Sequence, residues 1–127
     1  MAGVSDLSQL LARMEPDLHA APYGYAVAPA PIAGAFATVA EAEGLTVIAP
    51  VEALRAAGLE AGPPWARLSL TVHSDLAAVG LTAAFARALA DHKISANVVA
   101  GFYHDHIFVP WERRLDALAA LKGLSHA

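Results

Sequence analysis

Residues 66–109 read ARLSLTVHSDLAAVGLTAAFARALADHKISANVVAGFYHDHIFV, and the rest of the chain is arranged around them. In residues 66–72, apolar side chains alternate with polar ones, which is the period of a half-buried strand. Leu81, Phe85 and Leu89 then recur at intervals of four residues, so they share one face of a helix. The stretch therefore opens with a strand followed by an amphipathic helix.

The remainder of this stretch predicts a hairpin. Residues 94–102 are apolar and partly β-branched, residues 103–106 turn the chain, and residues 107–109 return as a strand that Pro110 ends. A strand, a helix and a hairpin in this order begin a ferredoxin-like βαββαβ unit. A last helix follows Pro110, but the final strand of such a unit is missing. The side chains predicted to form the core of this half are Leu70, Phe85, Leu89, Val98 and Phe108.

The first half of the chain is also an incomplete unit. Its expected elements are helices over residues 7–14 and 51–57, strands over residues 22–27, 35–40 and 45–49, and a loop over residues 28–34. A linker rich in Gly and Pro then joins the halves. We predict an α+β fold of two units, residues 1–62 and residues 63–127, which complete each other through shared or neighbouring strands.

Composition and charge exclude several classes of partner. The net charge is −4 and basic residues do not cluster, which argues against a nucleic-acid surface. No apolar run approaches the roughly 20 residues of a membrane helix, no secretory signal is visible and no cysteine is present. These features predict a cytoplasmic protein. Because 57% of the residues are hydrophobic and 16% are charged, we expect an apolar face covered in a homodimer.

The chain resembles a bacterial family of small tandem ACT-domain proteins that is largely uncharacterised. Residues 79–84, 89–95 and 97–110 carry the resemblance, and it extends to residues 40–47 in the first half. More distantly, residues 90–109 look like the ACT pairs of aspartate kinases and of the animal cytosolic arginine sensors. The resemblance implies two ACT-like, ferredoxin-like units that form a regulatory module without a catalytic domain.

ACT domains bind amino acids between the first strand–helix turn of one domain and the second strand of a partner domain, so the resemblance implies that ligand class here. Gly80 stands where the ACT pattern has a glycine that opens the first helix. The common Ile-Asn dipeptide is absent, because Ser95 follows Ile94 and Asn97 comes two residues later. Asp105 matches an aspartate of the arginine-sensor pattern.

The predicted strand–helix turn is the first candidate site. Backbone N–H groups at a helix N-terminus carry partial positive charge and suit a carboxylate, and a glycine lets a ligand approach closely. Valine at position 80 should weaken ligand binding more than folding, because valine is an acceptable, though not favoured, helix residue. In the structural alternative, Ser74 or Asp75 caps the helix and Gly80 lets two elements pack. The candidate ligand-binding residues of this turn are His73, Ser74, Asp75, Val79, Gly80, Leu81 and Thr82.

Asn97 is the second candidate. A polar amide within an apolar strand needs hydrogen-bond partners if it is buried. Its side-chain oxygen could bind the α-amino group of the ligand, from the same unit or from a partner unit, or it could pair with neighbouring backbone. Asp75 or Asp105 would add negative charge for a basic ligand.

The His104-Asp105-His106 turn offers a different function. Two histidines two residues apart on a strand point to the same side and could chelate a metal together with His73. The competing interpretation is a polar hairpin in which Asp105 favours the turn. Nucleophilic catalysis has little support, because the chain lacks cysteine and a G-x-S-x-G motif.

The sequence thus predicts a regulatory or sensor protein that binds a small molecule, an amino acid, without being an enzyme. In this interpretation the protein needs no metal and no cofactor. Two alternatives remain open. One is a metal-binding protein or enzyme that uses His73, His104, Asp105 and His106, and the other is a structural, self-associating module.

Overall fold

The computed structural model of the chain describes residues 6–71 and 79–125. The chain divides into two compact units: unit 1 combines residues 1–19 with residues 67–127, and unit 2 comprises residues 20–66. Each unit combines an antiparallel sheet with helices, so the predicted α+β, ferredoxin-like fold is confirmed. No helix in the described part of the chain is long and apolar enough to cross a membrane.

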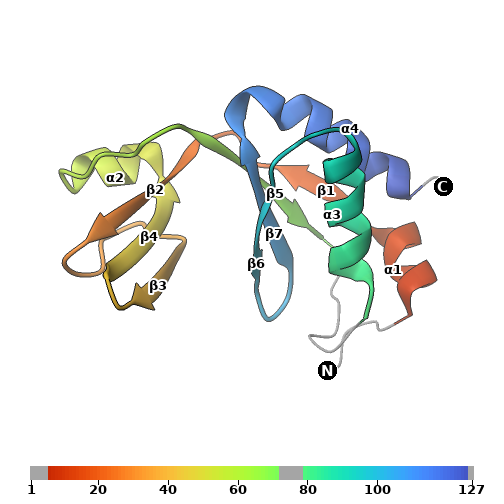
Figure 1. Ribbon diagram of the computed structural model, residues 1–127, viewed down its shortest axis with the longest axis horizontal. Coiled ribbons are helices and arrows are strands. Elements are labelled where there is room, and N and C mark those ends of the chain that lie inside the picture. The colour runs from red at the N-terminus through yellow and green to blue at the C-terminus, as the bar shows by residue number, and fades with distance from the viewer. Residues whose placement is uncertain (1–5, 72–78, 126–127) are drawn as a thin grey trace. The chain divides into compact units, whose positions relative to one another are not determined.

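The sheet of unit 1 takes its last strand from the opposite end of the chain (Figure 1). Its strand order is β1-β5-β7-β6, with β1 antiparallel to β5 and β6 antiparallel to β7. In a βαββαβ unit the first and third strands are central, and here β5 and β7 take those positions. The elements are α1 (Leu7–Arg13), β1 (Pro16–Leu18), β5 (Trp65–Leu70), α3 (Leu81–Asp91), β6 (Asn97–Ala100), β7 (Asp105–Pro110), a 3-10 turn η1 (Trp111–Arg113) and α4 (Arg114–Leu124). The expectation that the two halves complete each other's sheets is thus confirmed.

The helices α1, α3 and α4 cover one face of this sheet (Figure 1). Phe85 and Leu89 of α3 are fully buried, as the helical spacing predicted. Two residues predicted to pack with Phe85 and Leu89 in this core lie elsewhere in the structure. Val98 is 38% exposed on the edge strand β6, and Phe108 is buried on the opposite face from Leu70, because it lies two residues after His106 and shares that residue's face. The buried side chains of this unit include Leu10, Met14, Leu68, Leu70, Leu81, Phe85, Leu89, Ile107, Val109 and Leu121.

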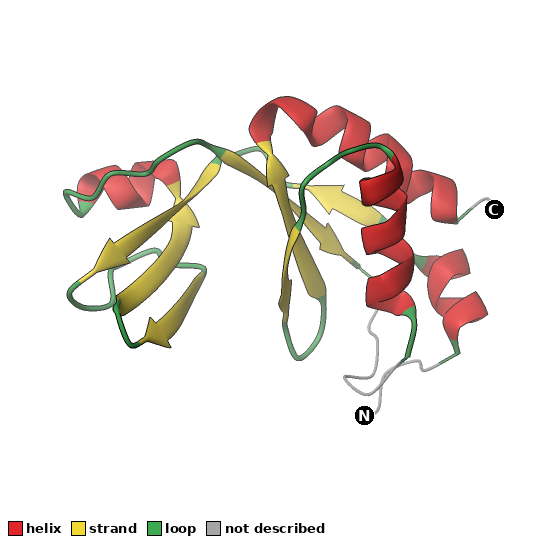
Figure 2. Ribbon diagram, viewed as in Figure 1, coloured by secondary structure: helices red, strands yellow, loops and turns green. Residues whose placement is uncertain are grey.

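Unit 2 has the same strand arrangement but lacks the first helix. β2 (Tyr23–Ala28) pairs along its length with β4 (Gly44–Pro50), and β3 (Ala37–Glu41) forms the outer edge. Trp65 at the start of β5 pairs with Tyr23 in the place of a fourth strand. A loop over residues 29–36 connects β2 to β3 (Figure 2), and Ile32 of this loop packs against the core of Ala28, Val47, Ala49 and Leu54. α2 (Val51–Ala56) contributes Leu54 to that core.

Candidate functional site

Three members of the predicted strand–helix turn, His73, Ser74 and Asp75, lie outside the described residues. The other members surround the start of α3. Val79 is 83% exposed and Thr82 is exposed on the first turn, whereas Leu81 is buried in the core. Leu81 can therefore offer a ligand its backbone N–H group but not its side chain.

Gly80 directly precedes α3 and has a φ of +97°. L-residues with a side chain rarely adopt this left-handed conformation. A Cβ atom at this position would also lie 3.0 Å from Cδ2 of Leu7 on α1. Gly80 therefore lets α1 pack against the start of α3, as the structural alternative proposed. The expectation that valine would be accepted at position 80 as a helix residue is wrong, because this position is not helical.

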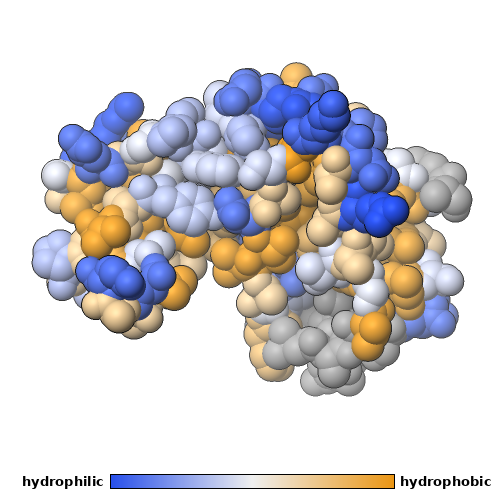
Figure 3. Space-filling view, viewed as in Figure 1, coloured by the Kyte–Doolittle hydropathy of each residue, from blue (hydrophilic) through white to orange (hydrophobic). Residues whose placement is uncertain are grey.

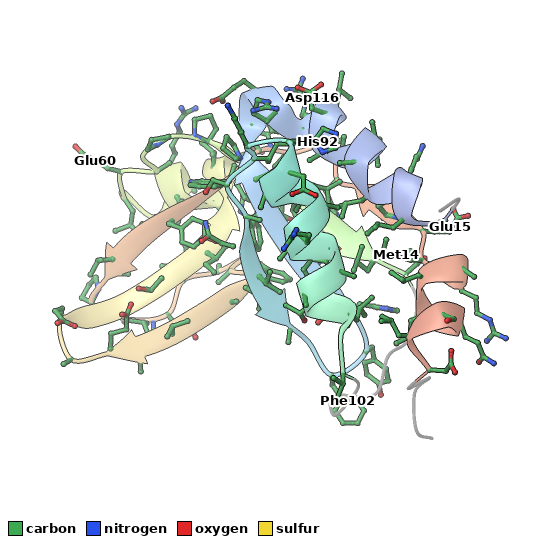
Figure 4. All side chains as sticks on the ribbon, turned by 45° about the vertical axis from the view of Figure 1, so that its right-hand side comes forward. Met14, Glu15, Glu60, His92, Phe102 and Asp116 are labelled. Carbon is green, nitrogen blue, oxygen red and sulfur yellow. The ribbon has the colours of Figure 1, made fainter. Side chains whose placement is uncertain are left out.

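Asn97 and the start of α3 lie at opposite ends of unit 1. α3 has 11 residues, which span roughly 16 Å, and Asn97 follows the turn at the far end of the helix. Figure 4 marks the two ends with His92 and Phe102. Asn97 is exposed, and it pairs with Phe108, so its side chain lies on the sheet face away from α3. Asn97 is therefore not a buried amide, and it does not join the α3 turn within one unit.

Asp105 lies at the same end of unit 1 as the start of α3. It is the first residue of β7 and precedes Ile107 by two positions, so it faces the helices. Burial raises the pKa of Asp105, and the nearby His104 partly offsets this effect. The hairpin before Asp105 exposes Phe102 and Tyr103, whose rings meet edge to face at 5.0 Å between centroids (Figure 4). The structure therefore brings Gly80, Leu81, Thr82 and Asp105 to one end of unit 1.

A chain of polar side chains lies on the other face of the unit 1 sheet. Nε2 of His19 lies 2.8 Å from Oγ of Ser69, and this Oγ lies 2.8 Å from Nδ1 of His106. Nη2 of Arg67 lies 3.2 Å from the same Nδ1. β5 supplies Arg67 and Ser69, β7 supplies His106, and His19 directly follows β1. Ser69 is buried between the two histidines.

The surroundings of His106 oppose its protonation. Burial, with the neighbouring Arg67, His104 and His19, lowers the pKa of His106 to about 4. Burial and Arg67 also lower the pKa of His19, and Asp17 acts in the opposite direction. A histidine with so low a pKa is a weak general base at neutral pH. The Ser69–His106 pair therefore lacks the basicity that activates a serine nucleophile.

The metal cluster of the alternative interpretation includes His73, which lies outside the described residues. Residues 6–71 and 79–125 contain no group of three or more His, Asp or Glu side chains that could hold a metal ion. Asp105 and His106 are successive strand residues and point to opposite faces. Nδ1 of His106 is engaged by Ser69 and Arg67, while Nδ1 of His104 is buried and has no hydrogen-bond partner in the described part of the chain.

The sequence patterns did not identify Arg67, Ser69 and His19 as site residues. A signal for two of them was present, because Arg67 and Ser69 alternate with buried leucines on β5 and so share one face. His19 gave no comparable signal. It belongs to the segment after α1, where the three-residue strand β1 begins with proline and escapes the strand pattern.

Two further hollows lie away from these sites. One, of about 520 Å³, lies between the end of α3 and α4, where hydrophilic side chains gather in Figure 3. There Arg113 donates to the carbonyl oxygens of His92 and Lys93 and pairs with Asp116, so its charge serves the C-terminus of α3. The other, of about 480 Å³, belongs to unit 2 and is lined by Tyr25, Ala26, Val27, Thr46, Glu60 and Gly62.

Comparison with known proteins defines the class. Residues 2–65 and residues 60–123 each match the ACT domain. Each match covers half of the chain, so the chain belongs to the ACT-domain family and is a tandem ACT-domain protein. The family resemblance predicted from residues 79–110 is therefore confirmed. No curated protein matches the chain.

Solved structures agree with this assignment. A Vibrio cholerae protein of unknown function, described as a possible transport protein, is 45% identical with a TM-score of 0.83 over 94% of this chain and 95% of that one. An Agrobacterium tumefaciens protein is 16% identical, with a TM-score of 0.74 over 89% and 90%. The regulatory subunit of aspartate kinase from Thermus flavus is 15% identical, with a TM-score of 0.65 over 89% and 98%. The two more distant structures share the fold.

Proposed function

We propose that this protein is a non-catalytic regulatory protein that binds an amino acid at the start of α3 in unit 1. The observation that carries the proposal is the pair of ACT-domain matches, which together extend over residues 2–123. ACT domains are regulatory modules that bind amino acids. The likeness in fold to a regulatory subunit of aspartate kinase accords with such a role.

The carboxylate of the ligand would bind at the N-terminus of α3. Gly80 has no side chain, and no side-chain hydrogen bond from it caps this helix. The N–H groups of the first turn are therefore suited to an anion, with help from the partial positive charge of the helix end. Val79 and Thr82 are exposed beside these groups, and the Thr82 hydroxyl can add a hydrogen bond.

Asp105 would bind the α-amino group of the ligand. Its carboxylate is half-buried at the same end of unit 1, and burial raises its pKa. An ammonium group beside Asp105 would stabilise the ionised form, so binding and ionisation would favour each other. In this proposal Asp105 takes the role first assigned to Asn97, and Asn97 could reach such a ligand only from a second copy of the chain.

The apolar tip of the β6–β7 hairpin supports a ligand with a hydrophobic part. Phe102 is 64% exposed, and Leu7 lies beside Gly80 with part of its side chain exposed. Side chains over this hairpin lean toward the hydrophobic end of the scale in Figure 3. A ligand whose carboxylate sits on α3 could cover this apolar surface with its own side chain.

A thermal-shift screen against the proteinogenic amino acids tests the proposal. A ligand that binds the folded form stabilises it by about 2.7 kcal/mol at a hundredfold excess over its dissociation constant. Calorimetric titration of the best ligand then compares Asp105→Asn with Asp116→Asn, an exposed aspartate at the other end of unit 1. Asp105→Asn should weaken binding by about 1–3 kcal/mol, and Asp116→Asn should bind like the unsubstituted protein.

Two results would contradict the proposal. If no amino acid raises the melting temperature, the ligand class is wrong. If an amino acid binds and Asp105→Asn binds it as tightly as the unsubstituted protein, the ligand class stands but the site lies elsewhere.

A further inference from the structure

β1 is attached to the sheet of unit 1 by few hydrogen bonds. It has three residues, and of these only Asp17 stands in a hydrogen-bonded pair with β5, because such pairs alternate along antiparallel strands. Its N-terminal end is anchored firmly, because Thr71 donates from both N and Oγ1 to the carbonyl of Glu15, and Ser125 donates to the carbonyl of Met14. Met14 and Glu15 are marked in Figure 4, where α1 leads into β1.

The C-terminal end of β1 is held differently. The backbone N–H of His19 donates to the carbonyl of Arg67, and the side chain of His19 bonds to Ser69. The hydrogen-bond chain His19–Ser69–His106 therefore ties this end of β1 to both central strands, β5 and β7.

The chemistry of the donors determines where the protons lie in the hydrogen-bond chain His19–Ser69–His106. A guanidinium only donates, so Nδ1 of His106 must accept from Arg67 and carries no proton. The hydroxyl of Ser69 donates to the same nitrogen, so the two donors share its single lone pair, and the oxygen of Ser69 accepts from Nε2–H of His19. These hydrogen bonds are all made with both histidines neutral and in defined tautomers.

We propose that the chain His19–Ser69–His106 is a proton-operated latch: it holds the end of β1 on the sheet while the histidines are neutral, and acidification releases it. Protonation of His106 removes the acceptor used by Arg67 and Ser69 and places a second positive charge 3.2 Å from Arg67. With His19 also protonated, three cationic groups surround one hydroxyl. β1 is the strand that yields, because it is short and lies at the edge of the sheet.

The other groups near the latch set the pH at which it opens. On this face Arg67 lies on β5, Asp17 and His19 lie on or beside β1, and His104 precedes β7. β6 contributes Asn97 and Val99 to the face, and neither titrates. Burial, Arg67, His104 and His19 lower the pKa of His106 from 6.5 to about 4. Departure of β1 removes His19 and the burial that β1 provides, so the released form binds more protons than the latched form within this pH range. Release therefore becomes easier as the pH falls through this window and changes little below it.

Nuclear magnetic resonance on the whole labelled chain provides the first test. At neutral pH, His106 should carry its proton on Nε2, with a titration midpoint near pH 4. The amide of His19, which donates to the carbonyl of Arg67, should exchange with solvent roughly tenfold faster or more at pH 4.5 than at pH 7, after correction for intrinsic exchange. The amide of Val47 in unit 2 should not share this change. A proton on Nδ1 or a midpoint near 6.5 would overturn the proposal.

Substitutions provide the second test. His106→Asn keeps an acceptor oxygen but cannot titrate, so β1 should stay protected and lose the part of its acid sensitivity that His106 supplies. Ser69→Ala removes the hydroxyl that links His19 to His106, and β1 should therefore be unprotected already at pH 7. His92→Asn changes an exposed histidine that bonds to the carbonyl of Ala88 and should behave like the unsubstituted protein. Equal pH dependence in His106→Asn and the unsubstituted protein would refute the latch, as would full protection of β1 in Ser69→Ala.

Discussion

At the scale of single residues, Gly80 meets two demands that a larger side chain meets poorly. Its φ is +97°, and a Cβ atom there would press on Leu7. Gly58 provides the matched control, because its φ is +76° and a Cβ atom there would meet open space. Gly80→Ala should therefore lower the free energy of unfolding by about 1–3 kcal/mol, and by more than Gly58→Ala does.

Urea denaturation of the two variants measures this difference. Equal losses at positions 80 and 58 would mean that the packing of Leu7 against the start of α3 contributes nothing to stability, and that backbone strain alone explains the glycine.

Asp105 and His106 illustrate how adjacent residues serve different faces. Successive strand residues point to opposite sides, so Asp105 faces α3 while His106 belongs to the latch. Burial is the leading influence on both, and it favours the uncharged form of each. It raises the pKa of Asp105 and lowers the pKa of His106. The side chains of Asp105 and His106 therefore lie in separate polar environments on the two faces of the sheet.

At the scale of elements, α3 is held by the side chains it buries. Phe85 is fully buried between α3 and the sheet, whereas Phe102 on the hairpin of the same unit is mostly exposed. Phe85→Ala should cost about 3–5 kcal/mol of stability, from lost burial and the cavity left behind. Phe102→Ala should change stability by less than about 0.5 kcal/mol. Thermal and chemical unfolding of both variants measures the two losses of stability. A small loss of stability in Phe85→Ala would mean that α3 packs through another face.

At the scale of the whole molecule, we predict a homodimer. Exposed apolar side chains remain on the edge strands and on α4, namely Val39, Val98 and Leu115. Edge strands with unpaired backbone groups and apolar side chains readily meet a second chain. Sedimentation at micromolar concentration should give twice the mass of the chain, and a monomer throughout that range would contradict the prediction.

The sequence by itself determined the local elements of unit 1 and the family. The alternation of residues 66–70 and the helical spacing of Leu81, Phe85 and Leu89 are local properties, because each reports which side of one element is buried. The loop between β2 and β3 and the helix before Gly58 also followed from local signals, Pro and Gly. The predicted turn site followed from the resemblance and from the chemistry of a helix end.

Tertiary structure alone decided which distant residues meet. His19 and Ser69 are 50 positions apart, and Ser69 and His106 are 37 apart. β1 completes the sheet of unit 1 because it pairs with β5, and no local pattern in its three residues indicates that partner. Asn97 and Gly80 lie at opposite ends of unit 1 for a similar reason, which is the direction in which β6 runs back along α3. Pairing between strands depends on hydrogen bonds and burial contributed by both partners, so it exists only once the chain has folded.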